Sequence, residues 1–257
     1  MSIPIGLLLL CISMLLAAGG LILVQRFVPI AVRRQHNDVA GFIYAVLGVV
    51  YAVLLALMVV AVWEQWNAAA ARADEEASEL AEVFWVADRL PESEGRHIQE
   101  LAHSYARVVV DEEWPLMRQG KSSQKAWDLL EEIRSEVQDF QPSTPAQLVL
   151  YEQALERVHE LADARRERLL EADHGLPEIL WVVLIIGGVV VIGFTYLFGL
   201  DSTVTHLLMV AALALVIALV LFTVGELDFP FRGGIRIGPE AMEQVLDRFE
   251  TSTLSDL

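Results

Sequence analysis

One stretch of the chain repeats residues with useful chemistry at a regular interval. Residues 41–47 read GFIYAVL and residues 48–54 read GVVYAVL, so one seven-residue pattern occurs twice in succession. A period of seven keeps equivalent side chains on one face of a helix. That face carries an uncharged row, formed by Tyr44, Gly48, Tyr51, Leu55 and Met58. Because tyrosine offers a hydroxyl and an electropositive ring edge, the row could line a conduit for anions, and its apolar members could gate the conduit by excluding water.

An overlapping row on the same stretch consists of small residues, with Gly48 shared between the two rows. Its other members are Gly41, Ala45, Ala52 and Ala56. Small residues let two helix backbones approach closely in lipid, where no hydrophobic drive brings helices together. The row therefore predicts helix packing, either within one subunit or between copies of the chain around an axis lined by this helix. The spacing leaves both arrangements open.

The remaining reactive side chains form no constellation. His159 and Asp163 are four residues apart on an expected helix, but two ligands do not make a metal site. Cys11 is the single cysteine and lies in an apolar run, so the chain has no internal disulfide. The sequence contains no glycine-rich phosphate loop, serine elbow or cysteine–histidine pair. We expect no catalytic residue, no cofactor and no metal, and a protein that is not an enzyme.

Two groups of charged residues call for an interpretation. The acidic group is interpreted as a solvated helix face and comprises Glu75, Glu76, Glu79 and Glu82. The basic group lies just before the third apolar run and comprises Arg165, Arg166 and Arg168. These arginines would meet anionic lipid head groups or pair with the acidic surface of their own helical domain. The second interpretation is favoured.

Four apolar helices must position the residues above. The runs 3–24, 39–63, 180–200 and 204–224 are each long enough to cross about 30 Å of hydrocarbon. The first run lacks the positive segment of a signal peptide, so a membrane anchor is favoured. Trp63, Trp66 and Trp181 are expected to anchor the spans at the membrane interface. Proton relays and voltage sensors are disfavoured, since no ionisable group except cysteine and tyrosine lies well inside a span.

Between the second and third spans, residues 64–176 have a helical pattern throughout. Apolar residues recur at intervals of three and four over residues 98–108, 129–140 and 148–162. The sequence thus predicts an all-α membrane protein with four transmembrane helices and a helical bundle inserted between spans two and three. The expected boundaries are 1–63 for spans one and two, 64–176 for the extramembrane domain, 177–225 for spans three and four, and 226–257 for a C-terminal segment.

Composition and charge narrow the partners. The chain is 55% hydrophobic, with a net charge of −17 that lies mostly in the middle domain. Nucleic acid is disfavoured, because its binding needs a basic face. Seven arginines flank the spans on the side of the middle domain and three lie in the loop between spans one and two. This asymmetry favours a multi-pass protein of the cell inner membrane with a cytoplasmic domain and cytoplasmic termini.

Several motifs together resemble the prokaryotic bestrophin-like family. They are the glycine–tyrosine heptads that end in Trp63-Glu64-Gln65, the EWPLM run at 113–117, the YLFG run at 196–199 and the LDFPF run at 227–231. The resemblance covers about residues 26–246. True bestrophins are pentameric anion channels with four spans per subunit and a pore lined by span two. The long acidic calcium clasp of their animal members is missing here, so calcium gating is not expected.

The resemblance implies an oligomeric bestrophin-like ion channel that conducts anions through a pore lined by the second span. Its expected partners are the lipid bilayer, further copies of the chain (a pentamer by resemblance) and inorganic anions. The alternative is a non-conducting membrane scaffold or signalling protein whose helical domain binds a partner.

Overall fold

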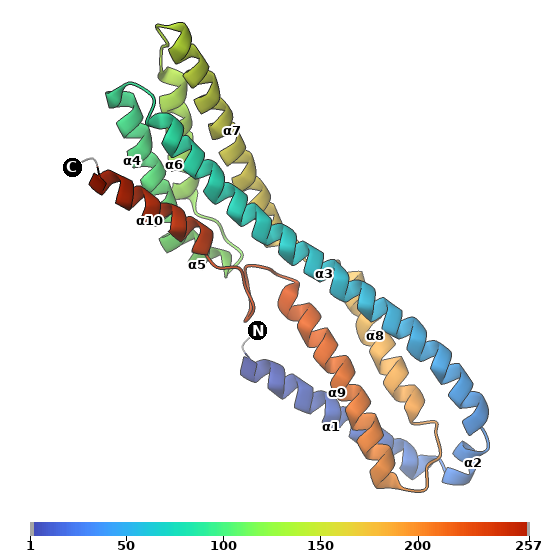
Figure 1. Cartoon of the computed structure of the whole chain (residues 1–257). Coiled ribbons are helices and arrows are strands. Elements are labelled where there is room, and N and C mark those ends of the chain that lie inside the picture. The colour runs from blue at the N-terminus through green and yellow to red at the C-terminus, as the bar shows by residue number, and fades with distance from the viewer. Residues whose placement is uncertain (1–2, 256–257) are drawn as a thin grey trace. The chain divides into compact units, whose positions relative to one another are not determined.

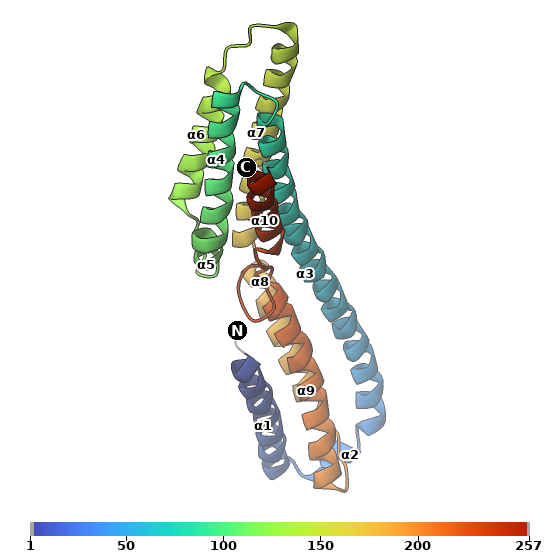
Figure 2. The same cartoon turned by 60° about the vertical axis from the view of Figure 1, so that its left-hand side comes forward.

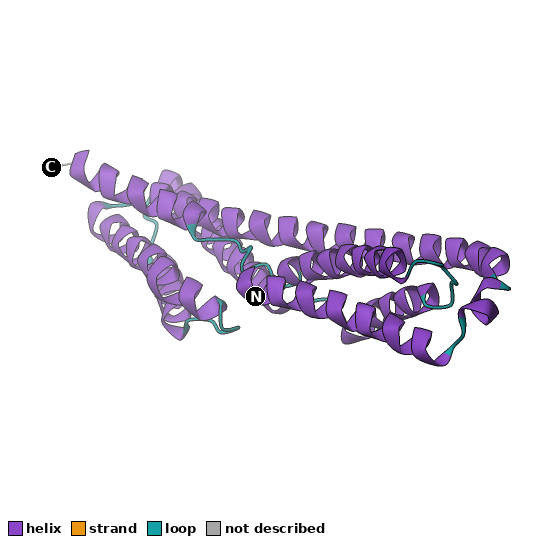
Figure 3. Cartoon of the chain, turned by 90° about the horizontal axis from the view of Figure 1, so that it is seen from below, coloured by secondary structure: helices purple, strands orange, loops and turns teal. Residues whose placement is uncertain are grey.

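The computed structural model describes residues 3–255, and its regular elements within that range are all helical (Figure 3). They are α1 (Ile3–Phe27), α2 (Ile30–Arg34), α3 (Asn37–Ala87), α4 (Glu92–Val108), the π-helical η1 (Val109–Glu113), α5 (Trp114–Met117), α6 (Gln124–Asp139), α7 (Pro145–Asp173), α8 (Glu178–Thr195), α9 (Thr203–Leu227) and α10 (Glu240–Ser255). The all-α prediction is confirmed. The chain divides into two compact units, unit 1 (Met1–Glu64 and Gly175–Asp228) and unit 2 (Gln65–His174 and Phe229–Leu257).

Unit 1 holds the four apolar spans. The apolar segments long enough to cross a membrane lie within the ranges Pro4–Phe27, Asn37–Ala87, Pro145–Thr195 and Thr203–Leu227. The third range comprises α7 and α8, and its apolar part is α8. Within the unit, α1 packs along α9, and α8 contacts both of them (Figures 1 and 2). Leucines such as Leu15 and Leu16 on α1 are more than 70% exposed. An apolar outer surface of this kind suits lipid, which solvates such side chains as well as a protein core does. The four predicted spans are confirmed, and the protein is a multi-pass membrane protein.

The third span ends earlier than the sequence predicts. α8 stops at Thr195, and a turn over residues 196–202 leads into α9, whereas the apolar run suggested a span up to residue 200. Gly199 makes this turn possible: a Cβ there would lie 2.7 Å from the backbone nitrogen of Arg34. The short helix α2, which was not predicted, thereby packs directly against the turn.

Unit 2 consists of α4, η1, α5, α6, α7, α10 and the α3 residues from Gln65 onward. The three amphipathic patterns of the middle domain correspond to α4, α6 and α7. Thr144 caps α7 by accepting a hydrogen bond from the backbone of Gln147, and Pro145 occupies the first turn. The C-terminal residues from Phe229 belong to this unit as well, and α10 packs on α4.

Aromatic and aliphatic side chains fill the core of unit 2. Leu80 and Phe84 of α3, Tyr105 of α4 and Val158 of α7 are buried together there. Phe84 stacks on Phe249 of α10 with ring centroids 4.0 Å apart. This contact explains why α10 forms: its apolar face has a partner that the sequence of α10 alone does not reveal.

Candidate functional site

The repeated heptad of α3 faces other helices of its own unit at Tyr51. Only 6% of this residue is exposed, and its hydroxyl donates a hydrogen bond to the backbone oxygen of Leu184 at 2.9 Å. The ring lies against two consecutive glycines of α8. A Cβ at Gly187 would come within 2.7 Å of the ring, and one at Gly188 within 2.9 Å of the hydroxyl. The Tyr51 ring can therefore pack here only because residues 187 and 188 of α8 lack side chains.

Two other members of the predicted row have similar surroundings. Tyr44 stacks on Phe194, with centroids 6.0 Å apart, and meets Phe198 edge-on at 5.7 Å. Leu55 packs against the buried cluster that Tyr51 forms with residues of α8 and α9. For these three residues the contacts favour packing within the subunit, which was the alternative interpretation of this face. The pore-lining role stays a prediction for Gly48 and Met58, which are half-buried.

The row of small residues lies on a different flank of α3. Ala45, Ala52 and Ala56 are exposed, and Gly41 is half-buried. A Cβ built at Gly48 would have no atom within 4 Å, so there is open space beside this flank. The flank is therefore free to receive another helix.

An apolar groove of about 590 Å³ runs along the opposite flank of α3, between α3 and α8. Its walls include Val46 and Val50 of α3 and Val183 and Val190 of α8. Tyr51 contributes a hydroxyl to the lining residues, but that hydroxyl already donates to Leu184. The groove thus offers only apolar surface.

The predicted interface tryptophans have different environments. Trp63 is 55% exposed, and Trp66 is half-buried. Trp181 is half-buried and donates its indole hydrogen to Asp228 at 3.0 Å. The same carboxylate accepts from the backbone of Leu176 at 2.6 Å. Asp228, from the LDFPF motif, therefore ties the end of α9 to the start of α8.

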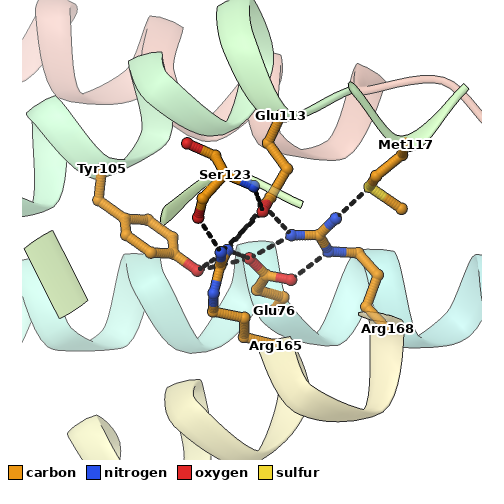
Figure 4. A network of polar contacts seen from close by, with 7 residues as sticks. All are labelled: Glu76, Tyr105, Glu113, Met117, Ser123, Arg165 and Arg168. Atoms are coloured by element: carbon orange, nitrogen blue, oxygen red, sulfur yellow. Dashed lines mark hydrogen bonds and ion pairs between the residues drawn. The ribbon is translucent and has the colours of Figure 1, made fainter. Parts of the chain in front are cut away.

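A buried network of charges lies inside unit 2 (Figure 4). Glu76 of α3, Glu113 of η1, and Arg165 and Arg168 of α7 are each 0% exposed, and Tyr105 of α4 joins them. The prediction that Glu76 belongs to a solvated face is wrong. Glu76 lies on the side of α3 that also buries residues 73, 77 and 80, so the apolar pattern around it was the available signal.

The arginines also differ from the prediction. Arg165 and Arg168 pair inside the core rather than with an acidic surface or with lipid. Arg166 points outward and pairs with Asp163 at 2.6 Å. The reason is helical spacing: residues 165 and 168 are three apart and share a face, whereas residue 166 is turned by about 100° from its neighbour.

Glu113 is the most fully bonded member of the network. Its carboxylate accepts two hydrogen bonds from Arg165, both at 2.7 Å, and one from Arg168 at 2.7 Å. The backbone nitrogen of Ser123 donates a fourth at 2.9 Å. Glu113 reaches this position through the π-helical turn η1, whose extra residue rotates the positions that follow it. Sequence reasoning did not identify Glu113 as a site residue, because a π-turn has no reliable local signature.

Glu76 and three aromatic rings complete the network. Glu76 accepts from Nε and Nη2 of Arg168 and from the hydroxyl of Tyr105, the last at 2.6 Å. The guanidinium of Arg165 lies 4.6 Å from the ring centroid of Trp127, and that of Arg168 lies 4.7 Å from the centroid of Trp114. The rings cover the cations with π-faces that attract them and exclude water.

The electrostatics keep these groups in one protonation state. Burial alone would raise the pKa of Glu113, but the charges of Arg168 and Arg165 outweigh it, and the pKa is lowered. Burial, helped by the charge of Glu76, raises the pKa of Tyr105 well above its ordinary value. Glu113 is thus held ionised and Tyr105 protonated near neutral pH. Neither suits general acid–base catalysis, which needs a pKa near the working pH.

The described part of the chain, residues 3–255, contains no group of three or more His, Cys, Asp or Glu residues that could hold a metal ion. What the geometry does define is a class of protein. It is a four-span, all-α membrane protein in which one chain also builds a helical extramembrane unit around paired internal charges.

Comparisons with known proteins identify the family. The sequence profile of the Bestrophin-like domain matches residues 11–242, so the chain belongs to the Bestrophin-like family. Comparison with curated proteins gives no match.

Solved structures show the same fold at low identity. A bacterial bestrophin homologue from Klebsiella pneumoniae is 15% identical, with 93% of this chain and 96% of that chain covered and a TM-score of 0.69. Two variants of that homologue are each 14% identical. One has a TM-score of 0.67 with 94% and 97% coverage, and the other 0.66 with 93% and 98%.

Proposed function

We propose that the protein is an oligomeric ion channel whose conduit is lined by α3 and that it conducts anions. Membership of the Bestrophin-like family and the shared fold support an ion channel kind of function. The observation that carries the role of α3 is its surface. Over the apolar span, a broad part of this helix has no covering helix within unit 1 and carries no charge.

Assembly of several copies is part of the proposal. The two flanks of α3 differ, since one presents small residues such as Ala52 and the other presents the groove walls at Val46 and Val50. Different faces that meet head to tail generate a closed ring when the rotation closes. In a ring of this kind, the small-residue flank of one copy would pack into the groove of the next copy. A third side of each α3 would then face the axis of the ring. Five copies are proposed from the resemblance to bestrophins.

A flux measurement on reconstituted protein tests the channel proposal. Val49→Ser places a polar side chain on the uncovered side of α3, between the small-residue flank and the groove, where Val49 is 64% exposed. A dry constriction would then become wettable, and conductance would rise. Leu15→Ser is the matched control, because Leu15 lies on α1 and is 72% exposed. The control should leave conductance unchanged. Absence of current from the wild type and from Val49→Ser would favour the non-conducting scaffold.

A specific observation favours a second candidate, a channel selective for cations. Unit 2 contains 29 Asp and Glu residues against 15 Lys and Arg, a net charge of −14. A strongly acidic surface raises the local concentration of cations within about 10 Å at ordinary ionic strength. The reversal potential in a potassium chloride gradient separates the two candidates, since it moves toward the equilibrium potential of the permeant ion.

The orientation belongs to the proposal as well. We place unit 2 and both termini in the cytoplasm and the spans in the inner membrane, because the arginines near the spans are more numerous on the side of unit 2. Fusion of a fluorescent protein that matures only in the cytoplasm to the C-terminus tests this. Fluorescent cells are expected, and dark cells with full-length fusion protein would reverse the orientation.

A further inference from the structure

A buried histidine stands at the turn between the third and fourth spans. His206 lies in the first turn of α9 and is 3% exposed. Its Nε2 is 3.0 Å from the backbone oxygen of Thr195, the last residue of α8. Its Nδ1 is 3.5 Å from the side-chain nitrogen of Gln25 on α1. The imidazole therefore bridges three helices.

These partners define the protonation state of the ring. A carbonyl oxygen only accepts hydrogen bonds, so Nε2 must carry the hydrogen that faces Thr195. In the neutral ring this leaves Nδ1 as an acceptor, which suits the amide nitrogen of Gln25 at 3.5 Å. This is the neutral imidazole with its hydrogen on Nε2. A second proton would convert Nδ1 into a donor and remove the bond to Gln25 as it stands.

A buried cation makes a second positive charge costly at this place. Arg33 of α2 is 6% exposed and donates to the backbone oxygens of Phe198 at 3.2 Å and Tyr196 at 3.5 Å. The C-terminal end of α8 attracts positive charge, but Arg33 already occupies the carbonyls there. Histidinium at residue 206 would therefore be buried beside a guanidinium.

We propose that His206 is an acid-sensitive latch, whose protonation loosens the turn of residues 196–202 between α8 and α9. The turn depends on side chains from several helices. Asn37 of α3 exchanges two hydrogen bonds with Gly199, at 3.0 and 3.1 Å, and His206 and Arg33 hold the carbonyls before it. Loss of the His206 bridge removes the contact between α9 and the carbonyl of Thr195 just before this turn, and the contact between α9 and Gln25 of α1.

Two other ionisable groups of this turn, Asp201 and Tyr196, are engaged elsewhere. Asp201 forms an ion pair with Arg34 and so is not directed at His206. The hydroxyl of Tyr196 donates to the backbone oxygen of Ala17 at 2.9 Å. Arg33 is buried at the same turn through its bonds to Phe198 and Tyr196, and a buried guanidinium disfavours a second positive charge nearby. The latch consequently responds to the ring of His206 rather than to a neighbouring carboxylate.

Hydrogen–deuterium exchange on the full chain in detergent tests the latch. An exposed histidine titrates near pH 6.5. At about pH 5.5, protonation of the ring in the opened turn therefore raises the population of the opened turn relative to the closed turn by a factor of about ten. We expect the peptide that covers residues 196–202 to lose about tenfold protection between pH 7.5 and about pH 5.5, after correction for intrinsic exchange. In His206→Gln, whose side chain is never protonated, the protection should remain.

His36→Gln is the matched control, since His36 lies near the same turn but is exposed. It should lose protection as the wild type does. Equal loss in His206→Gln, or constant protection in the wild type, would overturn the proposal. If His206→Gln does not accumulate, the wild type still decides the question, because the loss must be confined to the turn. A parallel loss in α4 of unit 2 would refute the latch.

Discussion

Replacement of Glu76 by glutamine removes one charge from the buried network of unit 2 without changing the shape of the side chain. Two guanidinium groups then face a single carboxylate, and the core holds one uncompensated positive charge. Arg168 loses its charged partner at Nε and Nη2 and retains only Glu113. Removal of one partner of a buried ion pair costs about 3–5 kcal/mol.

Glu79 supplies a matched control one helical turn further along α3. It pairs with Arg157 at 3.2 Å, and the two side chains are 19% and 32% exposed. Pairs near the surface contribute about 0–1 kcal/mol, so Glu79→Gln should cost little. At about 2–4 °C of melting temperature for each kcal/mol, the expected losses are about 6–20 °C for Glu76→Gln and under about 4 °C for Glu79→Gln.

The assay is thermal unfolding of the full chain in detergent, followed by circular dichroism and tryptophan fluorescence. A double variant tests whether the loss comes from the unbalanced charge. In Glu76→Gln combined with Arg168→Met the charges balance again, since Glu113 and Arg165 remain paired. It should therefore melt above the single variant Glu76→Gln. Losses for Glu76→Gln and Glu79→Gln that agree within about 2 °C would refute the reasoning that burial decides the cost.

Three further predictions concern other parts of the molecule. Because the pKa of Glu113 is lowered in the folded protein, its contribution to stability is fully present above about pH 4.3 and is lost as the pH falls toward that lowered pKa. Glu113→Gln should therefore make the melting temperature depend less on pH in the acid range. Gly48→Leu should shift the assembly toward monomer in native mass spectrometry, because leucine would fill the open space beside the small-residue flank; unchanged assembly would exclude that contact. Tyr51→Phe should lower stability in detergent by about 0.5–1.5 kcal/mol through loss of the hydrogen bond to Leu184, and no change would mean that this bond contributes nothing.

Much of the fold follows from the sequence. The four spans were predictable because twenty consecutive apolar residues are a local property, and lipid requires a helix of any segment that crosses it. The helices α4, α6 and α7 were predictable from apolar residues at intervals of three and four. The family could be anticipated from the repeated heptads and from the LDFPF run, in which Asp228 proves to bond with Trp181.

The side-chain environments within those helices were decided by tertiary contacts. Tyr51 has the spacing of a pore-lining residue, yet its ring packs inside the subunit against the glycine pair of α8, which is more than 130 positions away in the chain. Glu76 belongs by type to a solvated face, but two arginines of α7 and the π-turn that carries Glu113 make its burial possible. The periodicity of a helix reveals which residues share a face. What that face meets depends on segments distant in the chain, and this is why the sequence predicted the elements better than the partners of their side chains.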